Sequence, residues 1–490
     1  MHSCCETCIN RVHACTLHVV AVMQIVFLVA LYLLANRVRA GDDVYCRDER
    51  NKKVEWFVMY KFPANGVNYT QVKRGFNTNG LQFAYFDANT KNLSYWNMSS
   101  ETLYSEKNPL AYTLAKLFAK TKSRDIAYVT YNDQPYTGEE EPAKEPDGHR
   151  GKEYAHSKGI LMADATSGMW LVHSTPQFPM KVHMGEFNMT RTARKNGQYF
   201  MCLTVPPTEV DEIAELLLIQ SVIVNHGYGQ ESVVKKYPHL RALIKGKPID
   251  PWTTVKIATI KGINSTKFSA IAKPPRWKKD IYTHVITEQA KSDIWVQSWR
   301  RPMFGWLYPV CDRNYSVKDV ALLRFNFNST SYLEYSYLND HSKFAVAVNT
   351  SLFCFSSLNR GSTQFHRGGE LLCRDNETVA GLFRRTVAKV EACDATDPSG
   401  NPRPTTVPGD ATTTKKPWRW TTTSKKPHGA WPTRAPGNKP SKPVKPKPTR
   451  KPTKNPVVTK TTKKPMTKKT KRTKKPKLQK AQKTRKYKTQ

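Results

Sequence analysis

The sequence predicts a mixed α/β domain made of two pseudo-symmetric halves, with mixed β-sheets flanked by helices, followed by a disordered basic tail. Short β-rich runs alternate with amphipathic helical patterns from Cys46 to about Cys393, which favours this class. A ten-residue motif recurs once, 185 residues further along the chain, which indicates two halves. The formal charge of +39 is divided unevenly. Residues 401–490 carry +28, from 29 basic residues and one acid, and the other 400 residues carry only +11, from 49 basic and 38 acidic residues.

Residues 1–40 are predicted to form a signal peptide. Arg11 precedes an apolar run of 17 residues, 19–35, and Val38-Arg39-Ala40 places small residues where a signal peptidase cleaves. We expect cleavage after Ala40 and no stable membrane association of the mature chain. An uncleaved anchor is the alternative, but the run is short for a bilayer and contains Gln24.

Cysteines and glycosylation motifs both indicate export to the cell exterior or to an endolysosomal lumen. An even number of cysteines remains after residue 40, which predicts three disulfides with fifteen possible pairings. These cysteines are Cys46, Cys202, Cys311, Cys354, Cys373 and Cys393. Nine N-x-S/T motifs stand at Asn68, Asn92, Asn97, Asn188, Asn264, Asn314, Asn328, Asn349 and Asn376.

The predicted folded domain covers residues 41–395, with halves of about 41–225 and 226–395. Runs rich in aromatic and β-branched residues predict strands over residues 56–60 and 126–129. Apolar residues at helical spacing predict helices over 110–120, 209–224 and 378–392, and the second of these starts with acids that complement the helix dipole.

The tail, residues 396–490, is rich in Pro, Thr and Lys and has almost no aliphatic residues. Such a segment buries too little apolar surface to fold, so we expect it to be disordered. Trp418, Trp420 and Trp431 stand among its basic residues, a pattern that suits stacking on bases while cations neutralise phosphates. A solvated linker or an O-glycosylated stalk is an equal alternative.

The recurring motif reads AHSKGILMAD at residues 155–164 and DHSKFAVAVN at residues 340–349. In a regular strand, residues an even number apart point to one face. The residues that would share a face are His156, Lys158 and Asp164 in one copy, and His341, Lys343 and Asn349 in the other. Two such halves can contribute one His-x-Lys pair each to a common cleft.

Paired His-x-Lys motifs suit hydrolysis of a phosphodiester without a metal or other cofactor. One imidazole attacks phosphorus, the other protonates the departing alkoxide, and two lysines neutralise the non-bridging oxygens. Water then hydrolyses the phosphohistidine. The chain has no HExxH motif and no P-loop, and the spacing of Asp133 and Asp164 gives no metal signature.

At these motifs the chain resembles the deoxyribonuclease II family, whose halves are similar to those of the phospholipase D superfamily. The resemblance extends over most of the span from Cys46 to Cys393. The matching blocks are WFVMYKFP (56–63), YNDQP (131–135), HSKGILMAD (156–164), WLVHSTPQFP (170–179), NGQYFMC (196–202), QSW (297–299) and DHSKFAV (340–346). It implies an endonuclease that cleaves DNA at acid pH without divalent cations and leaves 3′-phosphate and 5′-hydroxyl ends.

The resemblance also implies residue roles. His341 matches the histidine regarded as catalytic, His156 matches its partner, and Lys158 and Lys343 match phosphate-binding lysines. Superfamily analogy makes His156 the nucleophile and His341 the general acid, although the exchanged roles fit the sequence equally well. The disulfides implied are Cys46–Cys202, Cys311–Cys393 and Cys354–Cys373.

Two positions depart from the family pattern. Phe344 replaces a tryptophan common after DHSK, and Asn349 takes the acidic place of the second copy although it is also a glycosylation motif. Asp164 and Asn349 are expected to support the site, and His173 is expected to be structural or close to substrate rather than catalytic.

DNA is the expected substrate, the tail is expected to bind polyanions, and a monomer is favoured. Two alternatives remain open at this point. One is a secreted binding protein without catalysis, and the other is a phospholipase D-like lipid hydrolase.

Overall fold

The computed structural model describes residues 23–24, 43–70, 79–136, 153–185, 187–246, 252–302 and 305–393. The predicted tail, and the predicted signal peptide apart from residues 23–24, lie outside these residues. Within the described part, no helix is both long and apolar enough to cross a membrane. The predicted mixed α/β class is confirmed, because two large, mostly antiparallel sheets carry a small number of helices.

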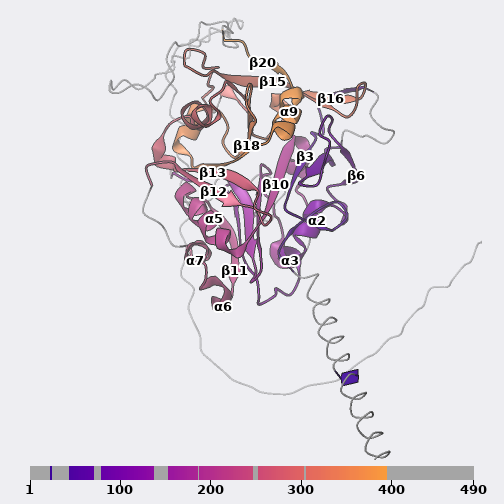
Figure 1. Ribbon diagram of the computed structural model, residues 1–490, viewed down its shortest axis with the longest axis vertical. Coiled ribbons are helices and arrows are strands. Elements are labelled where there is room, and N and C mark those ends of the chain that lie inside the picture. The colour runs from indigo at the N-terminus through magenta and orange to yellow at the C-terminus, as the bar shows by residue number, and fades with distance from the viewer. Residues whose placement is uncertain are drawn as a thin grey trace, which may run out of the picture. The chain divides into compact units, whose positions relative to one another are not determined.

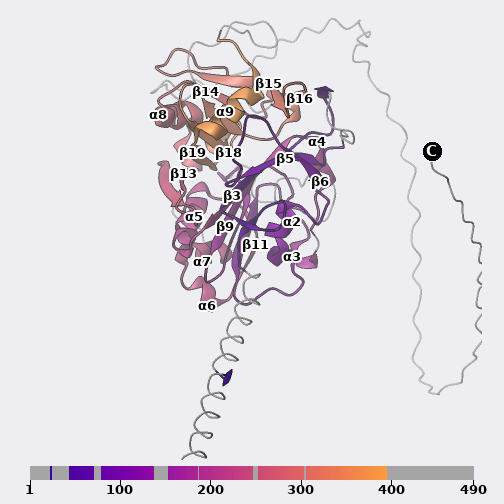
Figure 2. The same ribbon diagram turned by 45° about the vertical axis from the view of Figure 1, so that its right-hand side comes forward.

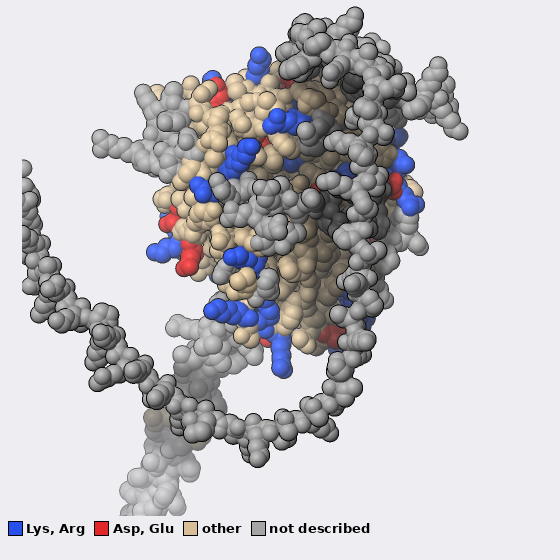
Figure 3. Space-filling view, turned by 180° about the vertical axis from the view of Figure 1, so that it is seen from behind, with Lys and Arg blue, Asp and Glu red and all other residues tan. Residues whose placement is uncertain are grey.

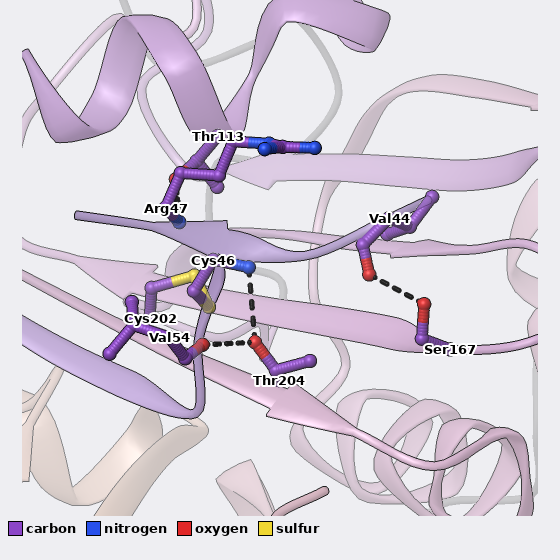
Figure 4. Close-up of a disulfide and its surroundings, with 8 residues drawn as sticks. All are labelled: Val44, Cys46, Arg47, Val54, Thr113, Ser167, Cys202 and Thr204. Carbon is purple, nitrogen blue, oxygen red and sulfur yellow. Dashed lines mark hydrogen bonds between the residues drawn. A yellow bond between two sulfur atoms is a disulfide. The ribbon is translucent and has the colours of Figure 1, made fainter. Parts of the chain in front are cut away.

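The first sheet has eight strands, all paired antiparallel. Their order is β11 (Val224–Gly229), β7 (Ala127–Asn132), β8 (Lys158–Ala163), β9 (Gly168–His173), β10 (Gln198–Val205), β3 (Trp56–Lys61), β5 (Gln82–Asp87) and β6 (Met98–Thr102). A short ribbon of β1 (Cys46–Arg47) and β2 (Lys53–Val54) lies beside it. The Cys46–Cys202 disulfide and the Thr204 hydroxyl fasten this ribbon to β10 (Figure 4).

The second sheet has ten strands, and only β14 and β15 pair in parallel. Their order is β12 (Lys256–Lys261), β13 (Lys267–Lys273), β19 (Gly369–Asp375), β18 (Leu352–Ser356), β17 (Phe344–Ala347), β14 (Ile294–Gln297), β15 (Val317–Asn326), β16 (Tyr332–Ser336) and β4 (Val67–Thr70), with β20 (Val387–Val390) also paired to β15. The orders β7-β8-β9-β10 and β14-β17-β18-β19 correspond, so the fold repeats. The repeat is not a clean division of the chain, because β4 comes from the first half.

Helices cover both faces of the first sheet, as Figures 1 and 2 show. Both faces need cover because both are apolar, as the alternation of residues along β3 shows. The core between the sheets contains Trp56, Val58 and Tyr60, and the outer core contains Phe57 and Met59. The α-helices are α2 (Pro109–Thr113), α3 (Ala115–Phe118), α4 (Arg191–Lys195), α5 (Pro207–Gln220), α6 (Glu231–Val234), α7 (Pro238–Ile244), α8 (Thr287–Ala290) and α9 (Glu377–Thr386). The 3₁₀ turns are η1 (Val182–Met184), η2 (Pro275–Trp277), η5 (Tyr337–Asn339) and η6 (Ser362–His366), and η3 (Tyr282–Ile286) is a π-helix.

Helices α5 and α9 contribute to the core between the two sheets. Phe383 of α9 packs on Phe353 of the second sheet at 4.0 Å and on Trp96 of the first half at 5.2 Å, measured between ring centroids. Aromatic contacts of this kind join the halves through a shared apolar layer.

The predicted strands match β3 and β7, whereas the predicted helices need correction. The helix over 110–120 is interrupted at Leu114. The helix over 209–224 ends at Gln220 and is capped by Ser221, whose φ of 61° is left-handed. The helix over 378–392 ends at Thr386, and β20 follows it. Val387 and Val390 are β-branched and pair with β15, so tertiary pairing overrides the helical spacing.

Candidate active site

Corresponding turns bring the two His-Ser-Lys segments together. Each segment leads into the second strand of the repeated unit, β8 or β17. The main-chain N–H of His156 donates to the carbonyl of Gly368 at 2.9 Å, and the N–H of His341 donates to the carbonyl of Gly197 at 2.8 Å. Gly368 directly precedes β19 and Gly197 directly precedes β10. Each histidine is therefore held by the opposite half of the molecule.

Acceptor atoms lie near both ring nitrogens of His156. Its Nδ1 lies 2.7 Å from the carbonyl oxygen of Ser357, and its Nε2 lies 3.8 Å from Oδ2 of Asp133. Asp133 also accepts hydrogen bonds from Lys158 and, at 2.8 Å, from Arg367. The ammonium of Lys158 donates in addition to the carbonyl of His156 at 3.2 Å.

The charges around His156 oppose one another. Burial raises the pKa of Asp133, but Lys158, His156 and Arg367 outweigh burial and hold that pKa below its usual range. Burial lowers the pKa of His156, as do Lys158, Arg367 and Lys343, whereas Asp133 acts in the opposite direction. The carboxylate therefore stays charged and favours the protonated form of the imidazole.

His341 has different neighbours. The ring of Trp299 lies against it at 4.0 Å between centroids, and the ammonium of Lys343 donates to the His341 carbonyl at 2.5 Å. Its Nε2 is buried and has no hydrogen-bond partner among the described residues. Burial lowers the pKa of His341, and the main charged neighbours, Lys343, Lys158, Lys61 and His156, all lower it further.

Asp340, which directly precedes His341, is already engaged. Its Oδ2 accepts from the Tyr60 hydroxyl at 2.5 Å and its Oδ1 accepts from the Ser342 N–H at 2.8 Å. Burial raises the pKa of Asp340, against the effect of these hydrogen bonds. This carboxylate fixes the turn before the histidine.

Burial lowers the pKa of Lys343 to about 7, and the charge of Lys158 contributes in the same direction. Lys343 is therefore positively charged at acid pH and loses its charge near neutrality. Burial likewise lowers the pKa of Lys61, beside Asp340, to about 7. The positive charge of these two lysines is therefore greatest at acid pH.

Asp133 and Trp299 occupy corresponding positions. Asn132 pairs with Lys158, so continuing the register places Asp133 opposite Ser157. Gln297 pairs with Phe344, and the same continuation places Trp299 opposite Ser342. The site residues missed by sequence reasoning are thus partly visible in the blocks YNDQP and QSW. Arg367, by contrast, stands in no motif.

Asp164 and Asn349 do not join the histidines, which corrects the expectation that they support the site. Each lies beyond the far end of its strand, about 26 Å along an extended chain from its histidine. Asp164 accepts from the N–H of Val44 at 2.7 Å and closes a turn with Ser167, which also holds Val44 (Figure 4). Asn349 is exposed. Alternation predicted the correct face but not the distance along it.

His173 lies at the end of β9 in an aromatic cluster. It is fully buried, with Phe178 at 5.2 Å and Phe200 at 5.6 Å between ring centroids. Its Nδ1 accepts from the N–H of Thr175 at 3.2 Å. These contacts fit a structural residue next to the site.

The three predicted disulfides are present as Cys46–Cys202, Cys311–Cys393 and Cys354–Cys373. The glycosylation motifs are accessible. Asn68, Asn92, Asn97, Asn264, Asn314, Asn328 and Asn349 are exposed, and Asn188 and Asn376 are partly exposed.

Comparison with known proteins agrees with this geometry. The family model described as deoxyribonuclease II matches residues 45–393. Plancitoxin-1 of Acanthaster planci is 29% identical over 377 residues, which is 76% of this chain and 99% of that protein. Deoxyribonuclease-2-alpha of Mus musculus is 29% identical over 71% of this chain and 93% of its own, and deoxyribonuclease-2-beta of Homo sapiens is 26% identical over 74% and 95%. The chain belongs to the deoxyribonuclease II family of DNA phosphodiester hydrolases.

Proposed function

We propose that this protein is an acid endodeoxyribonuclease that cleaves DNA without a metal ion and leaves 3′-phosphate and 5′-hydroxyl ends. The observation that carries the proposal is the pair of histidines, His156 and His341, each held by the opposite half and each followed by a lysine, Lys158 or Lys343. One imidazole forms a phosphohistidine, and the other gives a proton to the leaving oxygen and later takes one from water. The two lysines bind the scissile phosphate.

Acid pH follows from the charges in the site. The histidine that protonates the leaving group must be charged, and burial together with the neighbouring cations lowers the pKa of both imidazoles. Lys343, whose pKa is lowered to about 7, is also charged only below neutrality. Binding and proton transfer therefore weaken together as the pH rises.

The proposed setting is the cell exterior or an endolysosomal lumen. Three disulfides suit an oxidising compartment, and the accessible glycosylation motifs suit an exported chain. Lys and Arg side chains are spread widely over the face in Figure 3. The tail, with its +28 charge over residues 401–490, would tether the enzyme to DNA or another polyanion.

Nicking of supercoiled plasmid at pH 5 in EDTA tests the activity, with labelling of the products to identify the new ends. We expect relaxed and linear DNA that carries 3′-phosphates. DNA binding without cleavage by the purified wild-type protein would support a silent binding protein instead. Cleavage that requires a divalent cation would contradict the histidine mechanism.

A further inference from the structure

A cavity of about 260 Å³ lies at the end of strand β7, next to Asp133. We infer that this cavity binds one DNA base, turned out of the helical stack, beside the phosphate that is cleaved. The inference rests on the proposed function and deepens it, because it states the form in which the substrate enters the site.

The cavity shares a wall with the proposed catalytic site. Asn132 lines the cavity, and Asp133, the next residue, binds Lys158 through one carboxylate oxygen and Arg367 through the other. Consecutive Cα atoms are about 3.8 Å apart, so the cavity begins within one residue of the side chain that holds Lys158. It therefore adjoins the lysine that is proposed to bind the scissile phosphate, and the base of a nucleotide at that phosphate is within its reach.

Residues 221–225 tie the cavity to the first His-Ser-Lys turn. The carbonyl of Ser221 accepts from the N–H of Ala155, and the carbonyl of Ile223 accepts from the N–H of Asn132, each at 3.0 Å. Ile223 also lines the cavity. The same stretch of chain therefore positions the catalytic turn and one side of the cavity.

Hydrogen bonds hold the opposite wall, which is formed by the loop after β9. Nδ2 of Asn132 donates to the carbonyls of Thr175 at 3.2 Å and Phe178 at 3.0 Å. The N–H of Gln177 donates to the carbonyl of Gln134 at 2.9 Å. Because both walls are held by bonds within the protein, the cavity is formed before a ligand arrives, as is usual for binding sites.

The backbone departs from regular geometry on both walls. Gln177 has a left-handed φ of 59°. The pairing of β11 with β7 shifts register between Val224 and His226, and Asn225 stands at this shift with its Nδ2 donating to the carbonyl of Asn132 at 3.1 Å. Left-handed residues other than glycine and β-bulges cluster at functional sites, where they aim side chains at a ligand. Here they bring two amide side chains, those of Gln177 and Asn225, to the lining of the cavity.

The lining suits a neutral, flat heterocycle and not a phosphate. None of the described residues that form it is Lys, Arg, Asp or Glu. Ring faces suit stacking on a base, and amide groups can both donate to its edge and accept from it. The residues that offer rings or amides are Pro135, Tyr136, Gln177, Phe178, Pro179, Asn225 and His226.

The volume admits a single base but not a base pair, because it is below the roughly 300 Å³ at which sites for drug-sized ligands begin. A base in duplex DNA can therefore enter only after it leaves the stack and its partner. That step costs least where the base is already mismatched. Cleavage should then be fastest beside an unpaired base.

Three short duplexes that differ at one nucleotide test the inference. They carry a matched base, a mismatched base or a base-free tetrahydrofuran residue there, and cleavage by the full chain at pH 5 in EDTA is mapped on sequencing gels. We expect the mismatch to raise cleavage at an adjoining phosphate about tenfold, and to leave distant phosphates unchanged. The base-free residue should give no increase, because it loosens the backbone but has nothing to place in the cavity.

An equal increase with the base-free residue would overturn the inference, since the enzyme would then respond to a flexible backbone alone. Equal cleavage of the matched and mismatched duplexes would also overturn it. Either result leaves the proposed function intact, because all three duplexes are still cleaved in EDTA. Absence of cleavage in every duplex would instead remove the proposed function itself.

A variant that fills the cavity tests its location. Asn225→Trp places a large ring at the half-buried rim, and Asn89→Trp, at an exposed turn after β5, is the matched control. Asn225→Trp should cleave the three duplexes at one common rate, whereas Asn89→Trp should keep the preference for the mismatch. A preference that persists in Asn225→Trp would contradict the assignment to this cavity. The duplex comparison needs no variant, so it decides the question whether or not Asn225→Trp folds.

Discussion

The two halves build the same unit of strand and turn around His156 and around His341, but they fill corresponding positions with different side chains. Asp133 in the first half corresponds to Trp299 in the second. Gly197 and Gly368, whose carbonyls hold the two histidine segments, are called the clamping glycines below. The strands that follow them also differ, since β10 carries Tyr199 at the position where β19 carries Glu370. Pseudo-symmetry thus fixes where the two histidines lie, and the unmatched neighbours set the charges around each of them.

The largest effect on activity is expected from replacing either of the two corresponding histidines. The His156→Ala and His341→Ala variants should each reduce plasmid cleavage at pH 5 by about 10³-fold or more, because neither step of the reaction is complete without both rings. Gel quantification of nicking measures the loss, and fluorescence anisotropy with a short duplex should show nearly unchanged binding. Substantial cleavage by either variant would contradict a two-histidine site.

The next largest effect is expected at Glu370, the counterpart of Tyr199. Burial raises the pKa of Glu370 to about 7, although Ser157, Lys158 and Ser357 act in the opposite direction. The folded state therefore holds this proton more tightly than the unfolded state. The resulting stability is fully present below about pH 4.5 and is lost as the pH rises through about 7, by up to about 3 kcal/mol.

Urea unfolding of the wild type and of Glu370→Gln at pH 5 and pH 8 measures this dependence. The wild type should be more stable at pH 5 than at pH 8, and Glu370→Gln should reduce the difference. Tyr199→Phe is the matched change, since it removes the 3.0 Å hydrogen bond to the Ser356 carbonyl. It should lower stability by about 1 kcal/mol at both pH values. An unchanged pH dependence in Glu370→Gln would show that other groups cause it.

A smaller effect, on stability, is expected from replacing the two clamping glycines, Gly197 and Gly368, with alanine. A Cβ on Gly368 would lie 1.9 Å from the main-chain oxygen of Gln220, whereas a Cβ on Gly197 would lie 2.7 Å from a side-chain oxygen of Asp340. The main chain yields less easily, so Gly368→Ala should lower the free energy of unfolding by about 1–3 kcal/mol, and Gly197→Ala by less. Chemical denaturation tests the order, and a larger loss in Gly197→Ala would show that Asp340 is the more rigid neighbour.

The smallest effect is expected from removing the basic tail, a change that separates the contribution of the family domain from that of the residues after it. Truncation after Cys393 should leave cleavage of short DNA unchanged but weaken plasmid binding about tenfold at 50 mM salt, a difference that high salt abolishes. Filter binding across a salt series measures both quantities. If neither affinity nor its salt dependence changes, the tail does not bind DNA.

Much of this architecture follows from local sequence patterns. The repeated His-Ser-Lys segments predicted both the two halves and the two histidines, because strand periodicity and residue chemistry are local properties. Arg367 and Glu370 were not predictable in this way. They meet the site only through contacts between halves, at sequence separations that no periodicity records. Asp164 was wrongly placed because alternation along a strand gives a face without a distance.

One consequence of the strand order concerns cutting the chain between β11 and β12. None of the disulfides in the described part of the chain joins the two sides of such a cut, since Cys46–Cys202 lies before it and the other two bridges lie after it. Yet β4 forms the edge of the second sheet through its pairing with β16, and the carbonyls of Gly197 and Gly368 each bind the other fragment's histidine segment. A nicked protein should therefore remain assembled and active under native conditions, whereas separately expressed fragments should complement each other only if they fold together.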